Sequence, residues 1–218
     1  MNPFNKKYFK SILPFLNIPL SILICFFSIA CNREIDLSAL SKTDSNKKSL
    51  NLSQKNVQHW EDLSKFSELK ILEANFTKLT AIPSSVNSLS KLEILNLYGN
   101  DITSVENLDF RSLPNLEVLL LGANSLKQLS PNLKQAKKLR ILSLDRNPIT
   151  ITREDWEILS GLENLETLDL SESKTFINFP DVKTAPPKLK NVKLFKNRLN
   201  KESKTRMVEV LPNVKIDF

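Results

Sequence analysis

The hydrophobic residues recur in a fixed order from about residue 47 to the C-terminus. In the stretch 116–126, LEVLLLGANSL, leucines take the first, fourth, sixth and eleventh positions and an asparagine takes the ninth. Leu119 and Leu121 lie two residues apart, a spacing that places both side chains on one side of a short β-strand. The residues around them face the other way. The pattern therefore predicts a strand with one face in a hydrophobic core.

The same order of positions occurs seven times. Strong copies start at Leu92, Leu116, Leu139 and Leu189, and weaker copies start at Lys47, Leu69 and Leu165. Successive copies begin 22, 23, 24, 23, 26 and 24 residues apart. This spacing and the pattern LxxLxLxxNxL resemble the leucine-rich-repeat family, whose units are about 20 to 29 residues long. The resemblance covers about residues 47–218.

The resemblance implies an α/β solenoid. Each coil has too few apolar residues to fold alone, so the coils are expected to stack and share a continuous core. We expect a leucine-rich-repeat horseshoe of about seven coils with a parallel sheet on its concave side and a closing half-coil at the C-terminus. The domain is assigned to residues 47–218.

Asparagine at the ninth position is predicted to be structural. A buried amide there can satisfy backbone groups of the turn in its own coil and in the adjacent coil. The four asparagines in this slot are Asn100, Asn124, Asn147 and Asn197. In the weaker copies the slot holds Lys55, Thr77 or Ser173.

The first 30 residues have a different character. Lys6, Lys7 and Lys10 precede an uncharged run over residues 11–30, which ends at Ala30 and is followed by Cys31. This arrangement resembles a bacterial lipoprotein signal peptide, which implies removal of residues 1–30 and lipid attachment to Cys31. An uncleaved transmembrane anchor is the alternative, because 20 apolar residues can span a bilayer.

The segment 31–46 is predicted to be a lipidated flexible tether. It is rich in Ser, Asn, Asp and Lys and shows no helical or strand periodicity. After processing, Cys25 would be lost and Cys31 would carry lipid, so no thiol would remain. A disulfide framework and a cysteine-ligated metal site are therefore excluded in the mature chain.

Three segments are predicted to be helical. Residues 57–66 carry apolar side chains at intervals of three, which suggests a short α-helix or 3-10 helix in the convex segment of the first coil. Thr152 begins an N-cap motif that predicts a helix through Leu159. Residues 200–211 predict an amphipathic helix that packs Met207, Val208 and Leu211 against the core, followed by a closing strand.

Composition argues against most enzyme classes. The chain has three glycines, so a phosphate-binding glycine loop is not possible, and with a single histidine a Ser/His/Asp triad has almost nothing to be built from. His59 is predicted to be an exposed linker residue. No catalytic residue, cofactor, metal or small-molecule substrate is expected. The net charge of +7 comes from scattered lysines without stacking aromatics, which argues against nucleic-acid binding.

The outward positions of the strands form the candidate binding face. Apolar and aromatic side chains at its middle are followed by acidic and then basic ones, as on protein-binding surfaces. Phe76, Tyr98 and Leu120 are the candidate anchors. The predicted protein-binding residues are Glu73, Phe76, Asn96, Tyr98, Leu120, Asp145, Arg146, Asp169, Lys193 and Phe195.

The sequence thus favours a membrane-anchored, non-enzymatic module in a bacterial envelope that binds a protein on its concave face. Its membrane contact would be the lipid on Cys31. A purely architectural envelope lipoprotein is one alternative. A carbohydrate-active enzyme using the concave carboxylates Asp145, Asp169 and Glu172 is another, less favoured, because nothing signals an apolar pocket that would raise the pKa of one carboxylate.

Overall fold

The computed structural model describes residues 34–41, 44–173 and 184–218. The chain divides into two compact units, residues 1–33 and 34–218, and every described residue belongs to the second. The predicted signal peptide and the lipidation site Cys31 lie outside the described residues.

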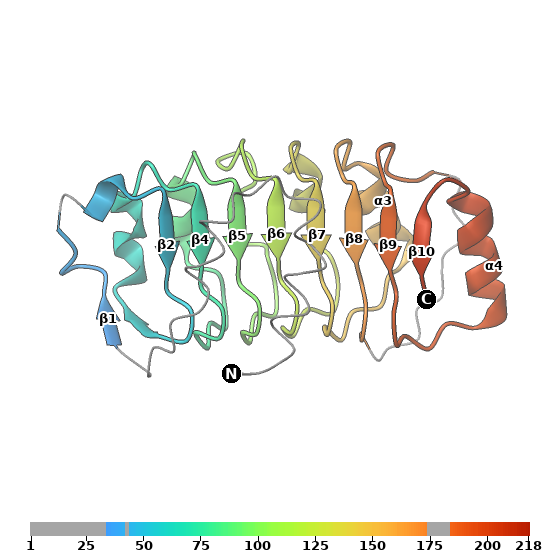
Figure 1. The fold of residues 1–218 in the computed structure, drawn as a ribbon, viewed down its shortest axis with the longest axis horizontal. Coiled ribbons are helices and arrows are strands. Elements are labelled where there is room, and N and C mark those ends of the chain that lie inside the picture. Colours follow the sequence, from blue (N-terminus) through green and yellow to red (C-terminus); the bar gives the residue numbers. More distant parts are fainter. Residues whose placement is uncertain (1–33, 42–43, 174–183) are drawn as a thin grey trace. The chain divides into compact units, whose positions relative to one another are not determined.

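An eight-stranded parallel sheet runs along the second unit in the order β10-β9-β8-β7-β6-β5-β4-β2 (Figure 1). Each strand is three residues long. The strands are β2 Ser49–Asn51, β4 Ile71–Glu73, β5 Ile94–Asn96, β6 Val118–Leu120, β7 Ile141–Ser143, β8 Thr167–Asp169, β9 Asn191–Lys193 and β10 Lys215–Asp217. Seven coils that each contribute one strand, followed by the closing strand β10, confirm the predicted solenoid.

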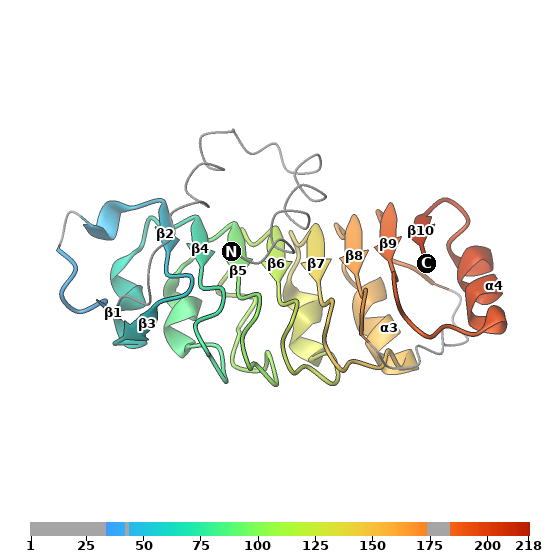
Figure 2. The same ribbon diagram turned by 60° about the horizontal axis from the view of Figure 1, so that its bottom comes forward.

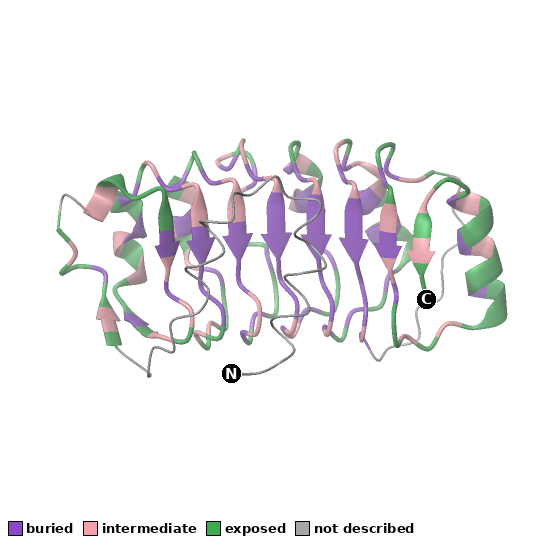
Figure 3. Cartoon of the chain, viewed as in Figure 1, coloured by how far each residue is buried: buried purple, intermediate pink, exposed green. Residues whose placement is uncertain are grey.

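The register between strands repeats from coil to coil. Leu72 aligns with Leu95, Leu95 with Leu119, and Leu119 with Leu142. All four side chains are fully buried, so the fourth repeat position forms a column of leucines through the core. Figure 3 shows that the strands are most buried in the middle of the sheet and that exposure increases in β2 and β10.

The return segments carry short helices on the far side of the sheet (Figure 2). Three are 3-10 helices, η4 Trp60–Lys65, η5 Ser84–Ser88 and η6 Pro131–Gln135, and one is the α-helix α3 Arg153–Ser160. The helix predicted in the convex segment of the first coil is confirmed by η4, and the helix predicted after Thr152 is confirmed by α3. The core side chains of these helices, Leu63, Val86, Leu133 and Trp156, are almost completely buried.

The asparagines of the ninth position form a hydrogen-bonded column between the coils. The Nδ2 of Asn124 donates to the carbonyls of Leu97 (3.0 Å) and Leu121 (3.0 Å), and its Oδ1 accepts from the amide of Ile102 (3.0 Å). The side chains of Asn100 and Asn147 also bond to the backbone of their own coil and of the preceding one, and that of Asn197 bonds to the backbone of the preceding coil at Leu170 and Ser173. These contacts have the geometry expected of a structural amide.

The folded unit begins earlier than the predicted boundary at Lys47. β1 Glu34–Asp36 pairs in parallel with β3 Asn56–Gln58, and Leu37 is fully buried. η3 Asp44–Asn46 follows. The prediction of a flexible tether over residues 31–46 is therefore wrong for residues 34–37, because the backbone pairing of β1 and the burial of Leu37 attach them to the first coil.

The last two elements of the described chain are α4 Lys201–Val210 and then β10. The Oδ1 of Asn200 caps the helix by accepting from the amide of Ser203 at 2.7 Å. Met207 and Leu211 are buried as predicted, but Val208 is 53% exposed and its predicted core position is wrong. Successive residues of a helix point about 100° apart, so the face that buries Met207 turns Val208 outward.

Candidate binding face

Seven of the eight strands of the large sheet, β2 and β4 to β9, are followed by the same backbone turn. The eighth repeat position has a left-handed conformation in all seven coils, with φ between 52° and 70°. Its residues are Gln54, Phe76, Gly99, Ala123, Arg146, Glu172 and Lys196. This region of backbone space favours glycine, yet only one of the seven is glycine.

Backbone hydrogen bonds hold these turns in place. The amide of Phe76 donates to the carbonyl of Tyr98 (3.0 Å), and the amide of Arg146 donates to that of Ser171 (2.8 Å). The ladder therefore continues past the three-residue strands. We call the seventh and eighth positions together the turn edge. It comprises residues 53–54, 75–76, 98–99, 122–123, 145–146, 171–172 and 195–196.

Two aromatic rings pack against each other on the turn edge. The centroids of Phe76 and Tyr98 are 5.6 Å apart with the rings at 73°, an edge-to-face arrangement. Gly99 makes this packing possible, because a Cβ there would lie 2.3 Å from Cε1 of Phe76. Phe76 remains 38% exposed. The pair thus presents an apolar surface on a fixed backbone.

A charged cluster continues from the aromatic pair. A guanidinium nitrogen of Arg146 donates to the hydroxyl of Tyr98, and another lies 3.0 Å from Oε1 of Glu172. Lys196 approaches the same carboxylate at 3.8 Å and also lies 5.1 Å from the ring centroid of Phe195. The side chains of this network come from the coils starting at Leu92, Leu139, Leu165 and Leu189, and the contact between Tyr98 and Arg146 passes over the coil starting at Leu116, so the network is one continuous surface.

Burial and charge shift the pKa values of three groups on this face. Glu172 raises the pKa of Arg146, and burial raises the pKa of Tyr98. Burial also raises the pKa of Glu73 to about 7, although a hydrogen bond from Asn51 Nδ2 at 2.6 Å opposes the shift. Glu73 therefore carries only part of a negative charge at neutral pH.

The predicted binding residues divide by exposure. Phe76 and Phe195 are exposed, and Tyr98, Arg146 and Lys193 are half-buried. The other five, Glu73, Asn96, Leu120, Asp145 and Asp169, are buried in the full-length chain. Leu120 is 4% exposed and lies between its in-register neighbours Asn96 and Ser143, so its prediction as an exposed anchor is wrong.

Two of the buried residues have a local structural role. The Oδ1 of Asn96 accepts from the amide of Tyr98 (3.2 Å), and the Oδ1 of Asp169 accepts from the amide of Ser171 (3.0 Å). Asn51 makes the same contact with Ser53 in the first coil. A short polar side chain at the fifth position therefore fixes the turn that follows the strand.

The turn edge was missed by the sequence analysis as a common structural feature. Its eighth position holds a different residue type in each of the seven coils, and only one of the seven is glycine, so no residue pattern marks it. The one available signal is the pair Gly99 and Gly122, in a chain with only three glycines. A Cβ at residue 122 would lie 2.1 Å from Oδ1 of Asp145.

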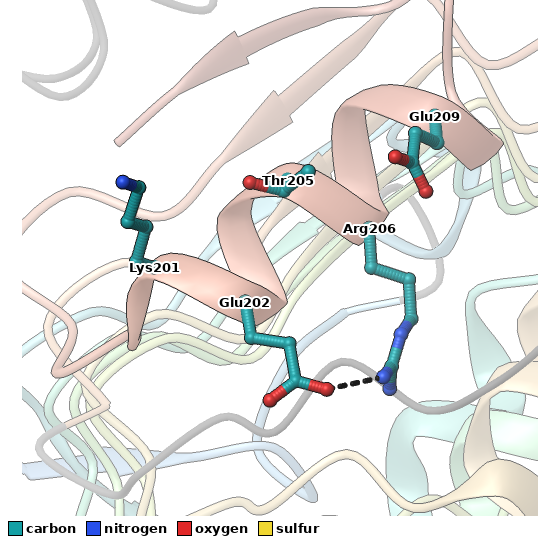
Figure 4. Close-up of a pocket in the computed structure, with 5 residues that line it drawn as sticks. All are labelled: Lys201, Glu202, Thr205, Arg206 and Glu209. Atoms are coloured by element: carbon teal, nitrogen blue, oxygen red, sulfur yellow. Dashed lines mark hydrogen bonds and ion pairs between the residues drawn. The ribbon is translucent and has the colours of Figure 1, made fainter.

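A second surface feature is a shallow hollow of about 540 Å³ on α4. Figure 4 shows its five lining side chains, all from this one helix, with an ion pair between Glu202 and Arg206 at 2.8 Å. Lined by charged side chains and without an apolar wall, it lacks the character of a substrate pocket.

The part of the chain that the structure describes contains no group of three or more His, Cys, Asp or Glu placed to hold a metal ion. None of its helices has the length and apolar character needed to cross a bilayer.

Comparison with known proteins supports the repeat assignment. A family model described as leucine-rich repeat matches residues 67–126 and 90–149. Tsukushi of Gallus gallus is 30% identical over 128 residues, which are 58% of this chain and 34% of that protein. Leucine-rich repeat-containing G-protein coupled receptor 5 of Rattus norvegicus is 33% identical over 138 residues, 61% of this chain and 14% of the receptor.

Solved structures share the fold. An internalin of Listeria monocytogenes superimposes with a TM-score of 0.64 at 21% identity, and a leucine-rich-repeat protein of Leptospira interrogans with 0.62 at 24%. Each alignment covers 81% of this chain and 50% of the other. The chain thus spans about a third of Tsukushi, about a seventh of the receptor and half of these structures. Its repeats, its parallel sheet and these likenesses show that it has the leucine-rich-repeat fold.

Proposed function

We propose that this chain is a non-enzymatic protein-binding module, anchored by lipid in a bacterial envelope, that recognises its partner along the turn edge of the sheet. The observation that carries the proposal is the continuous surface from the Phe76–Tyr98 pair to the Arg146–Glu172 ion pair. Exposed aromatic side chains next to a paired arginine are typical of binding surfaces.

The rigidity of this surface favours recognition. The aromatic pair and Arg146 lie on backbone that is hydrogen-bonded to the next coil, so little conformational entropy is lost when a partner binds. One relative is named as a G-protein coupled receptor, and receptors act through binding. Both points favour a binding function over a purely architectural one.

An enzyme using the buried carboxylates is the weaker hypothesis. Asp145 accepts a hydrogen bond from the hydroxyl of Ser143 at 2.7 Å, and Asp169 lies 3.6 Å from Nζ of Lys193 and accepts from the amide of Ser171. These carboxylates are 1% and 4% exposed. A sugar ring could not reach them in this arrangement.

The membrane anchor is proposed from Ala30 and Cys31 at the end of the uncharged run. With the folded unit beginning at Glu34, only residues 32 and 33 would separate the lipid from the first coil. The solenoid would then lie close to the membrane that carries it. Labelling with a radioactive fatty acid tests the anchor, because Cys31→Ser must abolish incorporation.

Site-specific photo-cross-linking in living cells tests the binding face. A photoreactive phenylalanine analogue at Phe76 is expected to form an adduct with a protein of defined mass. The matched control places the analogue at Val208, an exposed apolar position on α4 that lies off the turn edge. Introducing Arg146→Gln together with the analogue at Phe76 should weaken the adduct band.

Comparing the adducts formed from positions 76 and 208 decides whether the turn edge binds a protein. An adduct at residue 76 but not at residue 208 is the result we expect. The same band at both positions would mean non-specific proximity, and no band at either would favour the architectural alternative.

A further inference from the structure

Lysines occur along the whole chain, but the net positive charge of the solenoid is concentrated at its C-terminal end, because acidic residues balance the basic ones over the preceding coils. Residues 184–218 contain nine Lys and Arg against three Asp and Glu, a formal charge of +6, while the whole chain has +7. The nine are Lys188, Lys190, Lys193, Lys196, Arg198, Lys201, Lys204, Arg206 and Lys215. The rest of the chain is therefore close to neutral, and the charge is strongly polarised along the stack.

Part of this charge lies on the outer face of α4. Lys201, Lys204 and Val208 are exposed and spaced three and four residues apart, so they form one stripe on the helix. The opposite face buries Ser203 and Met207 against the core. Val208 is 53% exposed, an unusual position for a branched apolar side chain.

An aromatic ring lies beside this stripe. Phe218, which follows β10, is 40% exposed, and Nζ of Lys204 lies 4.9 Å from the centroid of its ring. Phe218 is in register with the buried core position of the preceding coil, Leu194, but no further coil of the described chain covers it. Lysine and apolar side chains are thus interleaved on one face.

We propose that this terminal face, made of Lys201, Lys204, Val208 and Phe218, docks on a membrane surface that contains anionic lipids. The positive charges of the lysines are complementary to the negative charges of the lipid phosphates. The two apolar side chains match the boundary between head groups and acyl chains, where Phe and aliphatic residues beside lysines are buried by interfacial proteins.

The apolar pair favours lipid over a soluble polyanion. A nucleic acid or an acidic polysaccharide would be held by the lysines alone, with a strong dependence on salt. Val208 and Phe218 would then contribute little. Binding to an anionic bilayer is strengthened by both kinds of side chain. Each lysine near the surface increases the affinity for the bilayer roughly fivefold. This contact is separate from the turn edge and does not depend on the proposed protein partner.

Vesicle sedimentation with residues 34–218 tests the proposal. This unit contains the described core from Leu37 to Leu211, and it lacks the apolar run 11–30, which would enter bilayers by itself. A cooperative thermal melt first checks that the fragment is folded. The probes are vesicles of phosphatidylcholine alone and of phosphatidylcholine mixed with phosphatidylglycerol.

We expect binding to the anionic vesicles only. The double variant Lys201→Gln, Lys204→Gln should lose about 30-fold in affinity. The control variant Lys127→Gln, Lys134→Gln removes two exposed lysines from a middle coil and should lose far less. Val208→Ser should reduce affinity about fivefold, because it removes an apolar group that the bilayer buries.

Three results would overturn the proposal. One is equal sedimentation with neutral and anionic vesicles, and another is an equal loss in the two lysine variants. The third is a weakened lysine variant with unchanged Val208→Ser binding, which would identify a site for soluble polyanions instead. Substitution of Phe76 should leave vesicle binding intact, so failure here and failure of the protein-binding proposal can be distinguished.

Discussion

At the scale of single residues, Asn124 shows how one side chain joins two coils. Its amide contacts the carbonyls of Leu97, Leu121 and Gly122 and the backbone amide of Ile102. These backbone groups lie inside the turns and are shielded from water, so without the amide they would be left unsatisfied. An asparagine is suitable because it offers donors and an acceptor on one short side chain.

The first prediction is that Asn124→Leu destabilises the fold clearly. Leucine is similar in size but cannot replace the hydrogen bonds, and each buried group left without a partner costs about 1 to 3 kcal/mol. Lys55→Leu, at the same position of the first coil, should be nearly neutral, because the ammonium group of Lys55 makes one hydrogen bond, to the carbonyl of Asn51 at 3.2 Å. Thermal melts of residues 34–218 compare the two, and equal melting temperatures for Asn124→Leu and the parent would contradict the prediction.

At the residue scale, the asparagine slot could be recognised from the sequence because a side-chain amide supplies both the donors and the acceptor that the turn backbone needs. Thr77 and Ser173 supply only a hydroxyl in the same slot, which donates to the carbonyl of Ala74 or of Leu170. The eighth position was not recognisable, since its turn is held by backbone hydrogen bonds and accepts Phe76, Arg146 or Glu172 equally. The exposure of Leu120 also depends on neighbours in adjacent coils, which a repeat pattern alone does not describe.

At the scale of elements, α3 shows how a local capping signal is used for contact between coils. Thr152 and Asp155 form a capping box, in which each side chain accepts from the other's backbone amide. Asp155 also accepts from the amide of Leu129 at 2.9 Å, and it is only 4% exposed. The carboxylate that caps the helix therefore also ties it to the preceding coil.

The second prediction follows from this double role. Asp155→Ala should cost more stability than Thr152→Ala, because it leaves the buried amide of Leu129 without an acceptor in addition to removing the cap. A lost cap costs about 0.5 to 2 kcal/mol, and the unsatisfied amide adds about 1 to 3 kcal/mol. Chemical denaturation measures both free energies of unfolding. Glu154→Ala, in the same turn, serves as the control, and an Asp155→Ala loss no larger than that of Thr152→Ala would refute the double role.

Element-level prediction depended on the strength of local signals. α3 was predicted because its cap and acidic first turn are encoded in four consecutive residues, 152–155. β1 was missed because three residues, Glu34–Asp36, have no detectable periodicity, and its pairing with β3 is a tertiary contact. The partner strand fixes its conformation, which sequence periodicity cannot reveal.

At the scale of the whole molecule, stability is shared between neighbouring coils. Besides the core and the asparagine column, ion pairs connect the second repeat position of adjacent coils. Lys70 pairs with Glu93 at 2.5 Å, and Arg140 pairs with both Glu117 (3.2 Å) and Glu166 (3.4 Å). Apart from the Arg146–Tyr98 hydrogen bond, which passes over one coil, these contacts join adjacent coils, so the solenoid behaves as a one-dimensional array whose end coils are held from one side only.

The third prediction is a gradient of hydrogen exchange along the array. The sixth repeat position offers a matched set of backbone amides, each donating to the next coil. Leu97 and Leu121 in the middle have hydrogen bonds of 2.9 Å, while Leu52 and Leu194 near the two ends have bonds of 2.7 Å. Hydrogen-bond length alone would therefore make the end amides the slower to exchange.

Opening of the end coils should reverse that order. β2 is covered by the sheet on one side and β10 is the last strand, so freeing either breaks fewer contacts than opening the middle of the stack. We expect Leu97 and Leu121 to exchange at least about tenfold more slowly than Leu52 and Leu194 in residues 34–218. Amide exchange followed by nuclear magnetic resonance measures this directly. Uniform protection would mean that the coils open only together, and faster exchange in the middle would contradict the nearest-neighbour account of how this stack is held.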